Sequence, residues 1–148
     1  MNYKFSIITP EHKKENIPFL MELYETIKAQ TYNDWEWVLY LNGSCKIAHL
    51  PQELKEDGRV KIHNGVSHPN VGLIKNKAFN LGKGDILVEV DHDDLLSEDC
   101  LEELNKAFQD KEVGFAYSED LLYDMRGDQY KVPWNPENGW THKDRKST

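Results

Sequence analysis

The sequence has few cysteines, no long apolar run and no leader-like segment. Its two cysteines, Cys45 and Cys100, form neither a CxxC motif nor a disulfide framework, so we expect two reduced structural thiols. No apolar run approaches the roughly 20 residues of a membrane span, which predicts no transmembrane segment. Residues 1–10 are too short and too polar for a signal peptide. We therefore expect a cytoplasmic protein.

Basic residues are also in short supply. The chain has 18 Lys and Arg against 26 Asp and Glu, which gives a net charge of -8. Such a surface repels a phosphate backbone, so nucleic acid is not an expected partner, and a phosphate ligand would need a bridging cation. With 148 residues, 39% hydrophobic and 11% aromatic, the chain is predicted to fold as one domain.

The apolar pattern predicts strands that alternate with helices, and no repeat or linker interrupts it. The expected strands are 4–9, which stops at Pro10, and 35–41, 59–63, 85–90 and 113–117. The expected helices are 17–27 with Asn16 as N-cap, 50–57, 72–81 and one that Ser97 caps, with a hairpin formed by 121–123 and 129–132. This order predicts an α/β fold with a mostly parallel sheet flanked by helices and a C-terminal hairpin.

Polar residues follow each of the first four predicted strands. They occupy residues 10–12, 42–44, 64–70 and 91–94. In an open parallel sheet, ligands bind beyond the carboxyl ends of the strands. We therefore expect these four segments to lie together along one edge of the sheet.

The segment after the fourth predicted strand gives the clearest indication of a metal site. Asp91, Asp93 and Asp94 place three carboxylates within four residues, and such like charges repel one another unless a cation is present. Hard oxygen ligands of this kind suit Mg²⁺ or Mn²⁺, which fill their remaining positions with water and phosphate oxygens. The alternative is a solvated acidic turn in which Asp94 helps to start the next helix. Leu95 and the lack of a loop glycine exclude an EF-hand.

Four segments resemble, in order and spacing, the family 2 glycosyltransferases of GT-A fold. They are SIITP at 6–10, DWEWVLYLNGS at 34–44, NVGLIKNKAFNL at 70–81 and GDILVEVDHDDLL at 84–96, and PWNPE at 133–137 is similar to some members. The resemblance implies a Rossmann-like GT-A domain over residues 1–148 that binds a nucleotide sugar and Mn²⁺ or Mg²⁺. It implies transfer, with inversion, from a UDP-sugar of the glucose or galactose type to a sugar or glycan acceptor.

The same resemblance implies roles for residues at the strand ends. Pro10 and His12 would line the base pocket, with Glu11 between them. The alternative for His12 is an exposed loop histidine without a binding role. Asn42, beside Gly43, stands where the family usually has an aspartate that reads uracil. Leu41 replaces a further acidic residue of the family pattern, so the chain departs from that pattern at the residues that would read the base.

The resemblance also assigns the groups around the diphosphate. Lys75 and Asn76 match a basic residue and asparagine pair, and Lys75 would approach the diphosphate as a point charge unless it is an ordinary exposed helix lysine. Asp91 would meet the ribose or the metal, and Asp93 would bind the metal that activates the leaving group. His92 would be oriented by its neighbours without binding the metal.

No general base is assigned by the sequence. In the family this carboxylate lies well past the metal motif, so the acceptor-binding half is expected to be short or missing here. Glu119 and Asp120 are the candidates, with a strand-end turn as the alternative. A non-catalytic nucleotide-sugar-binding module and an aspartate-nucleophile phosphatase remain as other functions. Trp134 and Trp140 suggest self-association into a homo-oligomer.

Overall fold

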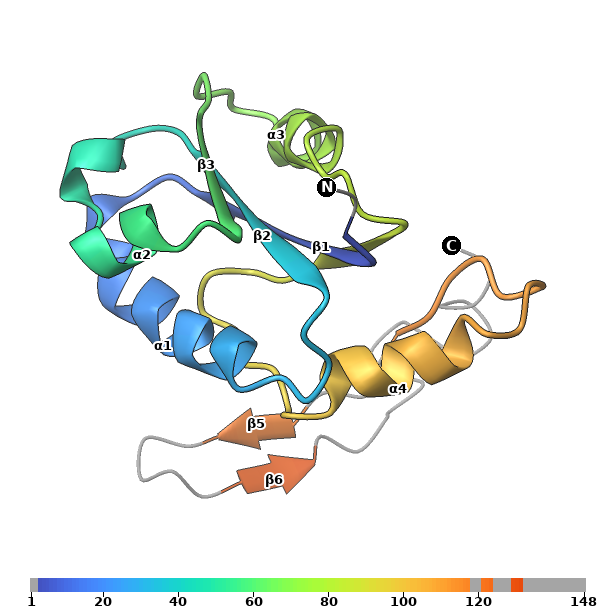
Figure 1. The fold of residues 1–148 in the computed structure, drawn as a ribbon. Coiled ribbons are helices and arrows are strands. Elements are labelled where there is room, and N and C mark those ends of the chain that lie inside the picture. Colours follow the sequence, from blue (N-terminus) through green and yellow to red (C-terminus); the bar gives the residue numbers. More distant parts are fainter. Residues whose placement is uncertain (1–2, 118–120, 124–128, 132–148) are drawn as a thin grey trace, which may run out of the picture. The chain divides into compact units, whose positions relative to one another are not determined.

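The computed structural model describes residues 3–117, 121–123 and 129–131, and the chain forms two compact units, residues 1–103 and 104–148 (Figure 1). The first unit contains β1 (Phe5–Glu11), η1 (Lys14–Asn16), α1 (Ile17–Lys28), β2 (Trp35–Leu41), η2 (Ile47–His49), α2 (Gln52–Glu56), β3 (Val60–Asn64), α3 (Val71–Phe79) and β4 (Ile86–Glu89). Helix α4 (Cys100–Ala107) begins in the first unit and ends in the second. The second unit also contains β5 (Leu121–Tyr123) and β6 (Gln129–Lys131).

The first unit is built on a four-stranded parallel sheet in the order β3-β2-β1-β4. Helices α1 and α2 cover one face of the sheet and α3 covers the other (Figure 1). Every residue of β2 is buried, because this strand has a neighbour on each side and helices above and below. The α/β prediction with a parallel sheet flanked by helices is confirmed.

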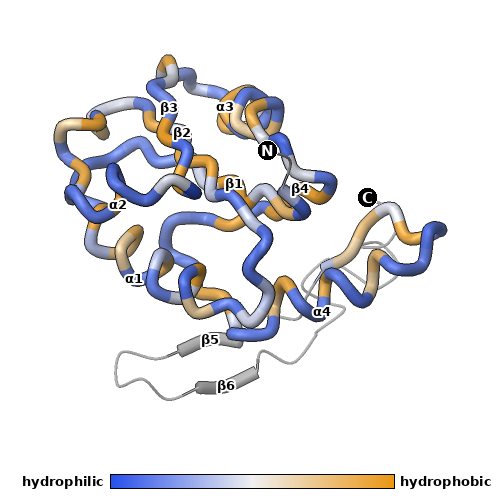
Figure 2. The backbone as a smooth tube through the Cα atoms, in the orientation of Figure 1, coloured by the Kyte–Doolittle hydropathy of each residue, from blue (hydrophilic) through white to orange (hydrophobic). Residues whose placement is uncertain are grey.

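Side-chain alternation along the strands divides the core between the two faces. On one face, Tyr24 of α1 stacks on Trp37 of β2 with ring centroids 5.7 Å apart. On the other face, Ile74 and Ala78 of α3 pack into a buried cluster with Ile8, Val38 and Tyr40. The helices alternate between hydrophilic and hydrophobic along their length, as amphipathic helices do (Figure 2).

Strand β1 runs two residues further than the sequence predicts. Pro10 lies inside it, at the register position opposite Tyr40. Pairing with β4 ends at Ile8, whose carbonyl oxygen accepts from Val90, whereas Glu11 bonds toward β2 through Asn42. Backbone groups alternate between the two neighbours, so the missing N–H of Pro10 faces the side where the β4 pairing has ended. The prediction that Pro10 stops the strand was wrong.

Two helix starts differ from the predicted caps. Asn16 holds the N-cap position of α1, but its side chain makes no cap hydrogen bond and donates to Glu11 instead. Helix α4 begins at Cys100, and Ser97 lies in the preceding turn, where its carbonyl oxygen accepts from Gln30 and from the Cys100 N–H. The Leu101 N–H, which would bond to the Ser97 carbonyl oxygen if Ser97 were the N-cap, donates instead to Gln30 Oε1 at 3.0 Å.

The segment 113–117 is not a strand. Asp110 closes a turn there, accepting from Glu112 through its side chain and from Val113 through its carbonyl oxygen. Within the part of the chain that the structure describes, the segment pairs with no other strand, and Phe115 is 64% exposed. The predicted hairpin is confirmed: β5 and β6 pair antiparallel, with Leu122 opposite Tyr130.

A buried hydrogen bond beneath α1 gives a test of this core. The Trp37 indole N–H donates to the Thr9 hydroxyl at 3.0 Å, and both residues are fully buried. We expect Thr9→Val, which keeps the shape but removes the acceptor, to lower the free energy of unfolding by about 1–3 kcal/mol because it leaves the indole N–H unpaired. Urea denaturation measures the effect. In a Trp37→Phe background, Thr9→Val should lower the free energy of unfolding by a smaller amount. An equal loss of unfolding free energy in both backgrounds would contradict this account.

Candidate functional site

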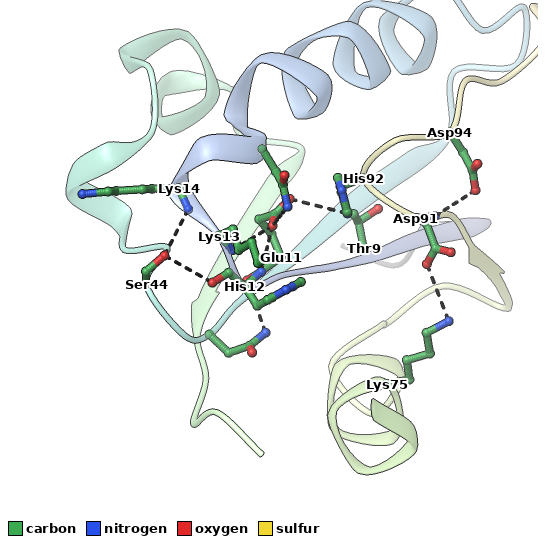
Figure 3. Close-up of polar contacts among 12 residues, drawn as sticks. Thr9, Glu11, His12, Lys13, Lys14, Ser44, Lys75, Asp91, His92 and Asp94 are labelled. Atoms are coloured by element: carbon green, nitrogen blue, oxygen red, sulfur yellow. Dashed lines mark hydrogen bonds and ion pairs between the residues drawn. The ribbon is translucent and has the colours of Figure 1, made fainter. Parts of the chain in front are cut away.

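The carboxyl ends of β1, β2 and β4 bring Glu11, His12, Ser44, Asp91 and His92 to one edge of the sheet (Figure 3). Direct contacts join three of the four predicted segments. Ser44, after β2, accepts from the Lys14 N–H and donates to the carbonyl oxygen of His12. His92, after β4, lies beside Glu11 at the end of β1. The expectation that these strand ends share one edge is confirmed.

Glu11 lies in the interior of this edge. Its side chain is fully buried, and Oε1 accepts from the backbone N–H of His12 at 2.8 Å, from that of Lys13 at 2.9 Å and from Asn16 Nδ2 at 2.9 Å. Oε2 has no hydrogen-bond partner among the described residues, and His92 Nδ1 lies 3.7 Å from it. Glu11 therefore holds the turn between β1 and α1, whereas Pro10 is half-buried and His12 is exposed.

The turn after β2 packs against the end of β1. Asn42 is almost fully buried, and its backbone N–H and its side-chain Nδ2 both donate to the carbonyl oxygen of Glu11, at 2.8 and 3.2 Å. Gly43 has a positive φ of 59°, and the N–H of Ser44 donates to the carbonyl oxygen of His12 at 2.9 Å. The amide of Asn42 thus sits at the β1–β2 junction with its nitrogen already in use.

Lys75 of α3 faces two carboxylates of the β4 end. Its Nζ bonds to Glu89 and lies 3.5 Å from Asp91 Oδ1. The hydrogen bond to Glu89 raises the pKa of Lys75, against the opposite effect of burial, and Asp91 adds to the rise. Lys75 therefore keeps its positive charge at the site through neutral pH. Asn76, the next residue of α3, is exposed.

The acidic turn after β4 is closed by Asp94. Its backbone N–H donates to the Asp91 carbonyl oxygen at 3.1 Å, and its Oδ2 accepts from the Asp91 N–H at 3.4 Å. The side chains of Asp91 and Asp93 are exposed, whereas His92 is half-buried. No three Asp, Glu, His or Cys side chains are grouped to hold a metal within the described ranges. Two exposed carboxylates still fit Mg²⁺ or Mn²⁺, which use one or two protein carboxylates together with water and phosphate.

Glu89 at this edge was missed by the sequence analysis, as was the cap role of Asn70, which lies in the predicted polar segment 64–70. Glu89 lies opposite Lys75, and the alternation of β4 could have shown it, because it places Glu89 on the same face of the sheet as α3. Asn70 caps α3, with its side chain accepting from the N–H groups of Gly72 and Leu73. Glu119, Asp120, Trp134 and Trp140 lie outside the described residues, as does the segment 133–137.

Comparison with known proteins decides the family. The family model described as glycosyl transferase family 2 matches residues 6–147. The chain belongs to glycosyl transferase family 2. A match that covers nearly the whole chain also removes the phosphatase alternative.

Relatives and solved structures agree with this assignment. The family 2 chain is 27% identical over 141 residues to the O-antigen biosynthesis protein RfbC of Myxococcus xanthus, covering 89% of this chain and 11% of RfbC. It resembles Staphylococcus aureus TarS 1–349 in complex with UDP, with a TM-score of 0.55, 22% identity and coverage of 73% of this chain and 32% of that one. It also resembles the mannosyltransferase PcManGT of Pyrobaculum calidifontis in complex with GDP-Man and Mn²⁺, with a TM-score of 0.63, 20% identity and coverage of 77% and 34%.

These likenesses to solved structures show the GT-A fold of the family 2 chain. The chain spans about a tenth of RfbC and about a third of each of the two structures. In the ranges that the structure describes, no helix has the length and apolar character needed to cross a membrane.

The close approach of Gly43 to β1 gives a test of the site's backbone. A Cβ at Gly43 would lie 2.5 Å from the carbonyl oxygen of His12, and its φ of 59° disfavours any L side chain. We expect Gly43→Ala to cost at least about 1–2 kcal/mol of unfolding free energy, measured by urea denaturation. Gly58→Ala is the matched control, because nothing lies within 4 Å of the added Cβ and its φ is not positive. Equal stabilities of the two variants would show that the turn is not held as described.

Proposed function

We propose that this domain is the donor-binding part of a glycosyltransferase that takes a UDP-sugar. The observation that carries the proposal is the convergence of Lys75, Asp91 and Asp93 at the end of β4, beside the ends of β1 and β2. One cation and two exposed carboxylates at a parallel sheet edge suit a metal-bound diphosphate. The family assignment supports a nucleotide sugar as the ligand that carries this group.

Asp91 and Asp93 would hold the Mn²⁺ or Mg²⁺, and Lys75 would bind the diphosphate. When bound, the metal supplies Lewis-acid stabilisation of the negative charge that grows on the leaving diphosphate. In the ligand-free chain, Lys75 is shared between Glu89 and Asp91. A diphosphate offers this ammonium more negative charge than Asp91 does, so we propose that Lys75 turns from Asp91 toward the phosphates.

Asn42, together with Gly43, would read the base, with Pro10 and His12 beside it. Its side-chain nitrogen already donates to Glu11 O, and an amide keeps an acceptor oxygen when its nitrogen donates. That oxygen suits the ring N–H of uracil. UDP-glucose and UDP-galactose remain the favoured donors, although the two solved relatives are in complex with UDP and with GDP-Man.

Transfer to a sugar or glycan acceptor, with inversion, completes the proposed reaction. A base must take the proton of the acceptor hydroxyl, and Glu119 and Asp120 remain the candidates, outside the described residues. The alternative is a module that binds the donor without turnover. Release of UDP from UDP-glucose or UDP-galactose in the presence of simple sugar acceptors separates the two.

The metal requirement gives the first test of donor binding. We expect calorimetric titration with UDP to show binding with Mn²⁺ or Mg²⁺ and its loss with EDTA, because the acidic chain needs a cation to hold a diphosphate. Asp93→Asn should weaken binding at least about 10-fold, the loss of one charged contact.

Asp85→Asn is the matched control, because Asp85 is exposed and lies at the other end of β4. It should bind UDP as the unchanged chain does. Binding that survives EDTA, or an equal effect of the two substitutions, would refute the metal site.

The base preference gives a second test. With Mn²⁺ present, we expect UDP to bind more tightly than GDP, because Asn42 offers one acceptor and a guanine edge presents two donors. Equal or tighter binding of GDP, measured by the same titration, would refute the proposed preference for uracil. It would not bear on the proposed metal site.

A further inference from the structure

Glu11 carries a buried oxygen atom that the contacts described above do not use. Its side chain is fully buried, Oε1 has three donors and Oε2 has no hydrogen-bond partner among the described residues. A buried carboxylate oxygen without a donor is costly, so such an atom indicates a donor that approaches in another state of the site. The three donors on Oε1 fix the orientation of the carboxylate, and therefore also the position of Oε2.

His92 is the side chain toward which Oε2 points (Figure 3). The distance from Oε2 to Nδ1 is 3.7 Å, which is longer than a hydrogen bond. The His92 side chain is 23% exposed while that of Glu11 is completely covered, so the imidazole lies between a buried carboxylate and solvent. The two nitrogens of an imidazole point away from each other, so Nε2 faces away from Glu11.

We propose that Glu11 is a positioning residue for His92. A small movement of the turn after β4 would bring His92 Nδ1 within hydrogen-bond distance of Glu11 Oε2. Oε2 then accepts a hydrogen bond from Nδ1–H. A carboxylate that accepts from one ring nitrogen fixes both the tautomer and the orientation of the ring. His92 Nε2 then carries no proton and is available as a hydrogen-bond acceptor in the turn that also contains Asp91 and Asp93.

An acceptor nitrogen at this position suits a hydroxyl group of the bound nucleotide sugar. Mg²⁺ and Mn²⁺ prefer oxygen ligands to imidazole, and the diphosphate oxygens accept hydrogen bonds. The ribose and the transferred sugar both carry hydroxyls that can donate to Nε2. This half of the inference rests on the proposed function. The pairing of Glu11 with His92 does not, because it is read from the ligand-free contacts.

Long-range ¹H–¹⁵N NMR of the histidine ring tests the pairing without any ligand. At about pH 8, where an ordinary histidine is neutral, we expect His92 as the Nδ1–H tautomer. In Glu11→Gln, the side-chain oxygen keeps the three donors and the amide nitrogen faces His92, so Nδ1 must accept and the tautomer reverses to Nε2–H.

Glu15→Gln is the matched control, because it makes the same change of charge at an exposed residue in the same turn. It should leave the His92 spectrum unchanged. An Nε2–H tautomer in the unchanged chain would overturn the proposal, and this spectrum decides even if Glu11→Gln does not fold.

Binding measurements with Mn²⁺ identify the hydroxyl. If a ribose hydroxyl donates to Nε2, 2′-deoxy-UDP or 3′-deoxy-UDP should bind about 3- to 10-fold more weakly than UDP. If a hydroxyl of the transferred sugar donates, UDP-glucose should bind more tightly than UDP by a similar factor. Either difference should vanish in His92→Ala.

A difference that persists in His92→Ala, or no difference in either arm, would overturn the acceptor role of Nε2. Failure of UDP to bind at all would instead refute the proposed function, while the NMR result for Glu11 and His92 would stand.

Discussion

The parallel pairing of β1 with β2 on one side and with β4 on the other is the constraint on which the site depends. Because parallel strands end at the same edge, this pairing brings residues 80 positions apart, Glu11 and Asp91, to neighbouring strand ends. The apolar contacts of α1 and α3 on the two faces hold the three strands in register. This packing places the polar groups of the edge close enough for Lys75 to reach Asp91 and for His92 to lie beside Glu11.

The charges at this edge support the proposal that this acidic family 2 domain binds a diphosphate together with a metal. Lys75 is held near the carboxylates of Glu89 and Asp91, and the hydrogen bond to Glu89 raises the pKa of Lys75. Asp91 and Asp93 remain exposed, with a net charge of -8 over the whole chain. A divalent cation would offset this repulsion where the phosphates arrive.

The sequence predicts best where one physical signal dominates. The run 35–41 matches β2 residue for residue, because a strand buried on both faces is a nearly continuous series of large apolar residues, interrupted here by the buried Glu36. Pro10 led to a wrong prediction of the end of β1. A proline ends a strand only where its missing N–H would be needed for pairing, and the register shows that β4 no longer pairs with β1 at Pro10. Segment 113–117 has strand-forming residues but pairs with no described strand. Glu11 shows the same limit, since only the fold reveals that its carboxylate is buried.

A crystal structure of the chain with UDP and Mn²⁺ tests the central claim most directly. The account predicts anomalous density for Mn²⁺ between the diphosphate and the carboxylates of Asp91 and Asp93, with the base beside Asn42 and Lys75 turned toward the phosphates. Nucleotide bound elsewhere would contradict it, for example in the groove between β3 and the loop after α3, which Tyr3, Lys61, His63 and Lys83 line. Nucleotide at the strand ends with no Mn²⁺ on Asp93 would contradict the metal assignment.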